Sequence, residues 1–356
     1  TKFLHATSIA DAPGFPLTSN FLHNRLNFRW YATKHVTLAV EMRNRFFWGE
    51  QVKVTPNFGD QIDQYDGLVD LSVRWAEGDA YLFHSVLDRF YGQYINGKWE
   101  LRLGRQRVNW GLNTVWNPND LFNAFNYLDF DYEERPGSDA IRLTYYPKIL
   151  TSLDVAFAPS RDSIEASTGA LKYKFNTSGY DIQLISGYYR GDLALGAGWA
   201  GSIGGMGFKG EGTYFVPLAP STDSLNRLSA SVSAEYMFGL GSGLFAMASV
   251  LYNGSASNQL LDLQNPLFGG APSPKNLFPS TWTFFLSGSG AATPLLNLNG
   301  SVFYAPDNHL TGLVPTVTYS VAENWDVDVI GQIFFAELPG GDFKHASSGV
   351  FFRLKQ

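Results

Sequence analysis

The stretch that decides the fold is "VTLAVEMRNRFFW", residues 36–48, in which the character of the side chain changes at nearly every step. The even positions carry mainly large apolar side chains: Val36, Leu38, Val40, Met42, Phe46 and Trp48. The odd positions include the polar and charged side chains Thr37, Glu41, Arg43 and Arg45. Because successive side chains of a β-strand point to opposite faces, this period of two predicts a strand with one apolar and one polar face.

The same alternation recurs along most of the chain. It is found in the segments Leu22–Tyr31, Val69–Trp75, Trp99–Leu103, Ile141–Tyr145, Leu153–Phe157, Leu171–Phe175, Leu228–Tyr236, Leu313–Val321, Trp325–Phe335 and Val350–Leu354. A tilted strand of about ten residues crosses the hydrocarbon layer of a membrane, and aromatic side chains gather where such strands meet its surface. Trp30, Trp48 and Trp99 stand at segment ends in this way. A soluble sandwich or propeller also alternates, but it seldom sets so many aromatic side chains against Arg, Glu, Ser and Thr.

Composition favours the membrane reading. Of 356 residues, 45% are hydrophobic and 15% aromatic, whereas only 16% are charged, against roughly 25% in a typical soluble protein. No run of about 18 apolar residues occurs, which excludes helical membrane spans. We therefore predict an all-β fold, a single transmembrane antiparallel β-barrel over residues 1–356, with about eighteen strands and sixteen as the alternative count. The net charge of −6 and the lack of a basic helix argue against nucleic acid as a partner.

The strand count predicts where the connections lie. An even number of strands brings both termini to the periplasmic side of an outer membrane and sends the connections after odd strands outward. Six longer connections follow odd strands in this count: 108–137, 159–167, 217–225, 254–279, 306–310 and 337–345. The segment 49–66 follows an even strand, so either the count is wrong near the N-terminus or this segment is a large periplasmic element.

Arginines are concentrated on the predicted inward face of the first strands. The candidate pore-lining residues are Arg25, Arg29, Arg43, Arg45, Arg74, Arg102, Arg105, Gln106, Arg107 and Arg142. Acidic residues on the same face are fewer: Glu41, Asp70, Glu100 and Asp139. Two interpretations stay open: cross-strand Arg–carboxylate pairs brace the wall of a wide barrel, or the surplus arginines select anions.

The arginines at 105 and 107 follow Gly104, where a strand gives way to a long segment. A one-residue bulge at this glycine would turn Arg105 and Arg107 from the lipid side to the lumen. The segment that follows, up to Gly137, contains many aromatic residues and the acidic run "DFDYEERPG". We predict that 108–137 folds into the lumen and narrows it, with Trp110, Trp116, Asn117, Asp120 and Phe122 as constriction residues. The alternatives are a lid outside the barrel or a surface for a partner protein.

The stretch "LRLGRQRVNWG", residues 101–111, resembles the motif of the alginate-export family of outer-membrane porins. The resemblance implies an eighteen-stranded, single-chain barrel whose arginine-lined lumen passes anionic polysaccharide, with Arg105 and Gln106 as lumen residues. The chain departs from the family at Arg107, where an acidic residue is common, and in "WNPNDLFN", residues 116–123, which has no counterpart in the motif. The family's substrate is therefore not carried over.

No constellation of residues points to catalysis. The six histidines are scattered, and no HExxH, GxSxG or phosphate-binding loop occurs. We expect no enzyme activity, cofactor or metal. The expected function is a porin-like channel in the outer membrane of a Gram-negative bacterium, open to anionic or sugar-like solutes, with membrane lipid and lipopolysaccharide as its surroundings. The rival is a non-conducting barrel that serves as a structural subunit or docking platform for a protein partner in the cell envelope.

Overall fold

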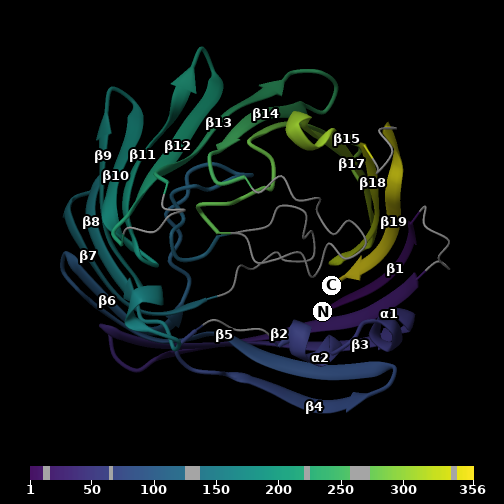
Figure 1. Ribbon diagram of the computed structural model, residues 1–356, viewed down its shortest axis with the longest axis horizontal. Helices are drawn as coiled ribbons and strands as arrows, with labels where there is room; N and C mark the ends of the chain where they lie inside the picture. The colour runs from purple at the N-terminus through teal and green to yellow at the C-terminus, as the bar shows by residue number, and fades with distance from the viewer. Residues whose placement is uncertain (11–16, 64–66, 125–136, 220–224, 257–272, 338–342) are drawn as a thin grey trace.

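A computed structural model describes residues 1–10, 17–63, 67–124, 137–219, 225–256, 273–337 and 343–356. The strands form one antiparallel sheet that closes on itself, because β1 (Lys2–Ala10) pairs with both β2 (Leu17–Tyr31) and β19 (Phe343–Lys355). The termini lie side by side, and the Thr1 amino group donates to the Gln356 carbonyl at 3.1 Å (Figure 1). Closure gives each strand of the ring a partner on both edges.

Strand β4 (Ser72–Gly78) does not take part in closing the ring. β3 (Val36–Gly49) pairs with one edge of β5 (Tyr81–Asn96). The other edge of β5 pairs at its start with β4 and at its end with β6 (Trp99–Gln106). β4 therefore extends the wall beyond the end of the short β6, and the other eighteen strands close the barrel, as predicted.

The remaining strands follow in chain order around the ring. They are β7 (Ser138–Lys148), β8 (Thr151–Ala158), β9 (Thr168–Thr177), β10 (Tyr180–Tyr189), β11 (Asp192–Ile203), β12 (Met206–Pro217), β13 (Arg227–Phe238), β14 (Leu244–Asn253), β15 (Trp282–Thr293), β16 (Leu296–Ala305), β17 (Leu310–Ala322) and β18 (Trp325–Glu337).

The two ends of the barrel differ. At the end that holds both termini, here called the turn end, each connection spans two to five residues, as at 97–98 and 239–243. The opposite end, here called the loop end, has the long connections. Among them are 50–71, with α1 (Glu50–Val54) and α2 (Phe58–Ile62), and 107–137. Two 3-10 turns, η1 (Ile164–Ala166) and η2 (Pro306–Asn308), also lie there.

This arrangement corrects the predicted count near the N-terminus. The strand Lys2–Ala10 was not recognised in the sequence, and it makes β3 the third strand of the barrel. The connection after β3 therefore follows an odd strand and lies at the loop end with the other long connections. It is not a periplasmic element.

The faces of the wall are inverted relative to a soluble protein. Large apolar side chains such as Phe28, Trp30 and Leu103 are exposed on the outside, whereas Glu41 and Asp154 are buried on the inside. An apolar band turned outward suits lipid and not water. Neither helix in the described ranges is long and apolar enough to span a membrane.

Three apolar clusters line the inside of the barrel towards the loop end. One joins α1 and α2, through Val52 and Phe58, to Phe47 and its neighbours on the wall. The second joins Trp110 and nearby residues to β7–β12. The third joins Trp116, Leu277 and Phe278 to β14–β18. Three connections thus fold inward and are held against different sectors of the wall.

Candidate functional site on the inner wall

The arginines of β2 and β3 form a ladder with two carboxylates. The Glu41 carboxylate accepts from Arg25 at 2.8 Å and lies 3.6 Å from Arg29. Asp88 lies 3.0 Å from Arg25 and 3.2 Å from Arg43. Asp88 is the extra residue of a bulge in β5, which brings a second acid to this face. Each carboxylate is shared between two guanidinium groups.

The next arginines have partners of different kinds. Arg45 contacts the His84 ring at 3.4 Å and lies over the Phe47 ring. Arg102 pairs with Glu100 at 2.7 Å. Arg142 pairs with Asp154 at 2.5 Å. Of these, Arg142–Asp154 is a cross-strand Arg–carboxylate pair, whereas the Arg102–Glu100 pair lies within β6.

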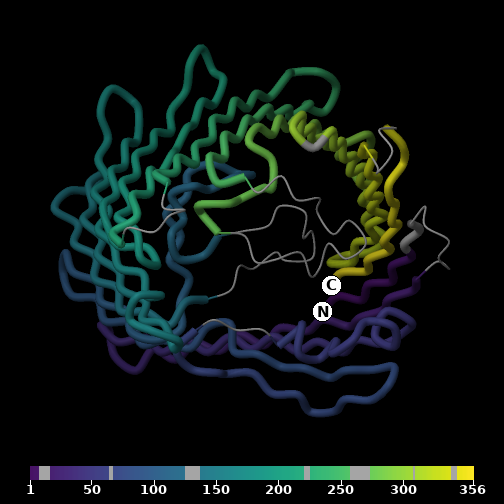
Figure 2. The backbone as a smooth tube through the Cα atoms, in the orientation of Figure 1, coloured from purple at the N-terminus to yellow at the C-terminus, as the bar shows by residue number. Residues whose placement is uncertain are grey.

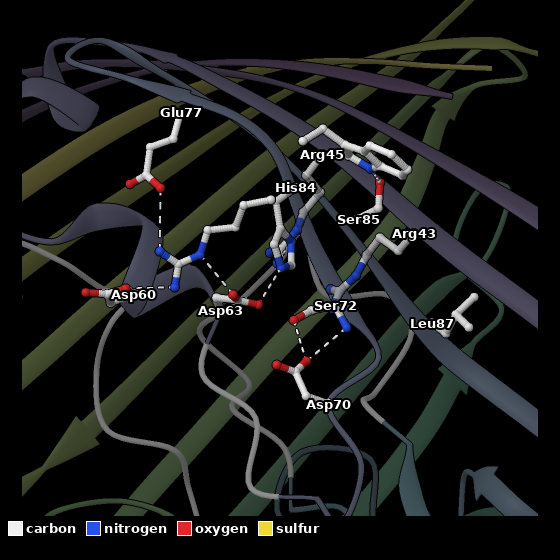
Figure 3. A network of polar contacts seen from close by, with 12 residues as sticks. Arg43, Arg45, Asp60, Asp63, Asp70, Ser72, Glu77, His84, Ser85 and Leu87 are labelled. Atoms are coloured by element: carbon white, nitrogen blue, oxygen red, sulfur yellow. Dashed lines mark hydrogen bonds and ion pairs between the residues drawn. The ribbon is translucent and has the colours of Figure 1, made fainter.

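Arg74 holds the connection that contains α1 and α2. Its guanidinium contacts Asp60 at 2.7 Å, Asp63 at 2.9 Å and Glu77 at 3.5 Å (Figure 3). Asp63 also lies 2.9 Å from the Nε2 atom of His84, which is buried in the wall. Burial acts to raise the pKa of Asp63, but hydrogen bonds from Ser72, His84 and Arg74 outweigh it and lower that pKa below its usual value. Arg74 is thus a fixed anchor at the loop end.

Pairing does not remove the positive balance of this sector, here called the charged wall (β2, β3, β5, β6 and β7). Its strands carry nine Arg and Lys residues against four Asp and Glu residues. Because the ladder shares each acid between arginines, the strands of this sector keep an excess of positive charge.

Gly104 does not produce the predicted bulge. The registers of β6 with β5 and with β7 run through Gly104 without a shift. The glycine is needed for another reason: its φ is 111°, and a Cβ atom there would lie 2.3 Å from the Phe90 carbonyl oxygen. The prediction of a register change was therefore wrong, although the local backbone is unusual.

Arg105 and Gln106 are consequently buried in the wall and are not free groups on a pore surface. The Arg105 guanidinium pairs with both oxygens of Asp139, at 2.8 and 3.1 Å, and also donates to the carbonyls of Leu87 and Val69. The Gln106 amide donates to the Ala140 carbonyl at 2.9 Å. Their exposed fractions, 2% and 0%, exclude contact with a passing solute. Arg105 joins β5, β7 and the segment before β4 where β6 ends.

Arg107 differs from its neighbour. Its side chain is half-buried, and it makes no ion pair with any residue in the described ranges. The two arginines that were predicted to act together therefore differ: Arg105 holds neighbouring strands together through an ion pair, whereas Arg107 lies at the start of the long segment without one in the described ranges.

The described part of that segment, 107–124, runs inside the ring of strands (Figure 2), and its apolar side chains pack against those of β7–β12. Trp110 is buried, and its Nε1 atom donates to Asp154 at 3.1 Å. Its backbone carbonyl accepts from Gln183 of β10 at 2.8 Å. Phe122 packs edge-on against Trp110, with ring centroids 5.1 Å apart.

Further along, asparagines bind the segment to β11, β12 and β13. Asn113 bonds the hydroxyls of Ser231 and Ser233, and Asn119 donates to the Ala197 carbonyl at 3.0 Å. The Glu211 carboxylate accepts from the Leu112 amide and lies 3.4 Å from Asn117.

The last two predicted constriction residues to be placed are Trp116 and Asp120. Trp116 packs edge-on against Phe285 of β15, with ring centroids 5.9 Å apart. Asp120 is fully buried, and its amide donates to the Asn117 carbonyl at 3.0 Å. The five predicted constriction residues therefore share one segment bound to the wall. The predicted acidic run and the aromatic residues from Phe125 to Tyr132 lie outside the described residues.

The end of the 254–279 connection also folds inward. Leu277 and Phe278 are buried against β14–β18. The Lys275 ammonium pairs with Asp192 at the start of β11, three strands away from β14, and lies 5.8 Å from the centre of the Phe215 ring. Residues 257–272 of the same connection are outside the described part.

The sequence patterns left one sector unnoticed. Strands β14, β15, β16 and β17 contain no Asp, Glu, Lys or Arg. Their inward side chains towards the turn end are mainly Ser, Asn and Thr. The sequence feature that could have identified this sector is the absence of charged residues over four successive strands. Clusters of charged residues do not reveal it. We call this sector the uncharged wall.

No protein-family model and no curated protein matches the sequence. Solved structures do match its fold. OccAB1 of Acinetobacter baumannii has a TM-score of 0.60 at 10% identity, covering 99% of this chain and 94% of that one. OccK10 (OpdN) of Pseudomonas aeruginosa has a TM-score of 0.55 at 12% identity, covering 99% and 96%. Wzi of Escherichia coli, described as a carbohydrate-binding β-barrel involved in capsule assembly, has a TM-score of 0.57 at 10% identity, covering 100% and 84%.

These similarities are similarities of fold. Together with the apolar outer band they identify an outer-membrane β-barrel of the porin type. In such barrels the short turns are periplasmic and the long loops extracellular. The turn end therefore faces the periplasm, and the three inward segments lie at the outer mouth.

Proposed function

We propose that this chain is a porin-like channel for the passive diffusion of anionic or sugar-like solutes across the outer membrane. The observation that carries the proposal is the inner surface: a closed eighteen-strand barrel whose wall presents a positive sector facing a sector of hydroxyl and amide groups. A lumen of this kind hydrates polar solutes and sets their charge preference through fixed side chains.

The positive balance of the charged wall supports the anionic part of the proposal. Arginine keeps its proton at any physiological pH, so this balance is permanent. The ion pairs reduce the field but leave five more basic than acidic residues in these strands, nine against four. The carbohydrate-binding description of Wzi, a barrel of the same fold, supports the sugar-like part.

The rival function is a non-conducting barrel that acts as a subunit or docking platform of an envelope complex. Its specific support is the outer mouth, where three segments are fixed to the inside of the wall through the apolar clusters. If these segments close the passage, the barrel carries no current.

Recording purified protein in planar bilayers separates the two functions. We expect discrete open steps, with a reversal potential in a salt gradient that indicates anion preference. A preparation that inserts and is heat-stable on gels, yet gives no steps, would favour the envelope subunit.

A further inference from the structure

The uncharged wall has a defined array of polar side chains towards its turn end. The β-sheet register places them in three rows that run directly across the strands. The first row is Met247, Ser287, Ser301 and Val314; the second is Phe245, Ser289, Asn299 and Thr316; the third is Ala291, Asn297 and Thr318. Rows on one face are spaced by two residues, about 7 Å, and strands by about 4.8 Å. The array is thus a continuous patch and not a scatter of polar residues.

Most polar side chains of this patch have no partner within the described ranges; Thr318, which donates to Asp328, is an exception. The side chains of Ser287, Ser289, Asn297, Asn299 and Thr316 form no hydrogen bond with another side chain or with the backbone in those ranges. Asn297 and Asn299 are exposed. Inward serines of β13 that lie nearer the loop end are occupied, since Ser231 and Ser233 bind Asn113 of the inserted segment. Exposed amides and hydroxyls without partners are available to a solute.

The patch lies in a hollow of suitable size. A recess of about 460 Å³ is lined in part by Phe245, Ser289, Asn297, Asn299, Thr316 and Thr318. Small-molecule sites commonly have volumes of roughly 300–1,000 Å³ and combine a few polar groups with apolar or aromatic surface. The half-buried Phe245 ring supplies the aromatic surface at the end of the second row.

The electrostatics exclude an ionic ligand as the natural occupant. No charged residue lies on β14–β17. Two acids adjoin the patch in the register, and both are already paired. Asp328, across from Thr318, is bound by Thr318 at 2.6 Å, Arg353 at 2.8 Å and Lys355 at 3.2 Å. Glu235, across from Met247, is bound by Lys209 at 2.6 Å. An ion placed here would lose hydration without gaining an opposite charge. A sugar hydroxyl both donates and accepts hydrogen bonds, as do the Asn and Ser or Thr groups of the patch.

From these observations we propose that the uncharged wall holds a binding site for neutral saccharides, centred on Asn297, Asn299 and Thr316 with Phe245 as the stacking surface. The site rests on the proposed channel function only for the route by which the sugar arrives. A solute crossing the barrel would meet the field of the charged wall on one side and this neutral surface on the other.

Equilibrium binding of maltotriose, a neutral linear trisaccharide, to the detergent-solubilised full chain tests the site. We expect saturable binding that does not change between low and high salt. Replacing both amides, Asn297→Leu with Asn299→Leu, should weaken it by about tenfold, because two hydrogen-bonding groups are lost. Trigalacturonate, an anionic trisaccharide of the same length, should be insensitive to this double change.

A matched pair of substitutions controls for folding and for general effects on the lumen. Thr316→Val removes one hydroxyl from the patch and should weaken maltotriose binding a few-fold. Thr37→Val makes the same change on the inward face of β3, in the charged wall, and should leave binding unaltered. Resistance to heat on gels verifies that each variant is folded.

The outcomes separate this site from the channel function. Binding of maltotriose without ion current supports the site and removes the channel. Current without maltotriose binding, or binding that the double change and Thr37→Val affect equally, overturns the site and leaves the channel intact. Tighter binding of trigalacturonate that is lost with Asn297 and Asn299 overturns the neutral-ligand assignment.

Discussion

The charged wall and the uncharged wall belong to one sheet, yet they use their inward side chains differently. On β2 and β3 the arginines are held by shared carboxylates such as Glu41 and Asp88. On β16 the side chains of the inward asparagines, Asn297 and Asn299, bond to no residue in the described part of the chain. Charged side chains turned inward require partners because their desolvation is costly, whereas neutral amides can stay hydrated and open to ligands. The comparison shows that the side chains of the charged wall mainly stabilise the barrel through ion pairs. The exposed amides of the uncharged wall are the groups that a solute can contact.

The largest effect is expected where the charged wall is tied together. Replacing Arg105 by Gln removes the guanidinium from the largely buried Asp139 carboxylate, which is 11% exposed, and removes donors to the Leu87 and Val69 carbonyls. Loss of one partner of a buried pair costs roughly 3–5 kcal/mol. We expect failed assembly or a large drop in the denaturant midpoint of the folded barrel. Asn299→Leu, on the uncharged wall, should leave the free energy of unfolding within about 0.5 kcal/mol of the wild-type value. Equal losses of stability in Arg105→Gln and Asn299→Leu would contradict the distinction between the charged and the uncharged wall.

The second effect concerns the outer faces, where the two walls should not differ. Val40 of β3 and Val317 of β17 both take outward positions. An arginine in place of either should destabilise the barrel by roughly 2–4 kcal/mol if the position is at mid-depth in the membrane. Folding into lipid vesicles, followed by gel mobility, measures this. Thr37→Arg, on the inner face, is the control and should fold normally. Tolerance of Val40→Arg would show that the assigned faces are reversed.

A smaller effect is expected at the inserted segment, which bridges the two walls. Trp116→Ala removes the contact with Phe285 of β15, so about 2 kcal/mol of local apolar stabilisation is lost. The segment should detach from the uncharged wall while the barrel ladder stays closed. We expect higher single-channel conductance with unchanged heat resistance. Unchanged conductance would mean that this segment does not limit passage.

The smallest effect is expected at the edge of the charged wall. The Arg29 side chain is 58% exposed and lies 3.6 Å from Glu41, and such pairs contribute roughly 0–1 kcal/mol. Arg29→Gln should leave stability unchanged and shift the reversal potential slightly towards cations. A stability loss as large as that of Arg105→Gln would contradict the distinction between exposed and buried arginines.

The fold could be predicted because strand alternation can be read directly from the sequence. A period of two residues, with one apolar and one polar face, repeated over many segments of about ten residues, is typical of a β-barrel in a membrane. Strand β1 was missed because its nine residues, Lys2–Ala10, alternate poorly. The open question about the segment 49–66 followed from that omission, and the alternative of a miscount near the N-terminus is the one that holds. β4 shows a second limit, since a strand that pairs with half of its neighbour looks like any other strand in the sequence.

The candidate site was predicted less well. The arginines were found, but their partners depend on register, and Asp88 reaches Arg25 and Arg43 through a bulge that the sequence does not mark. A glycine in a strand marks a bulge or a close backbone approach, and at Gly104 the second holds: a close approach to the Phe90 carbonyl is present, whereas the register shift expected from a bulge is absent. The uncharged wall was overlooked because single Ser and Asn residues become a surface only when four strands lie side by side.

The measurement that tests the central claim most directly is the reversal potential of single channels in a salt gradient, recorded at low and at high salt. If the charged wall faces an open lumen, the wild-type channel should prefer anions at low salt. That preference should fade as salt rises, because the Debye length falls from about 30 Å at 0.01 M to about 3 Å at 1 M. Open channels that prefer cations, or a preference that does not respond to salt, would contradict a lumen governed by the positive balance of β2–β7.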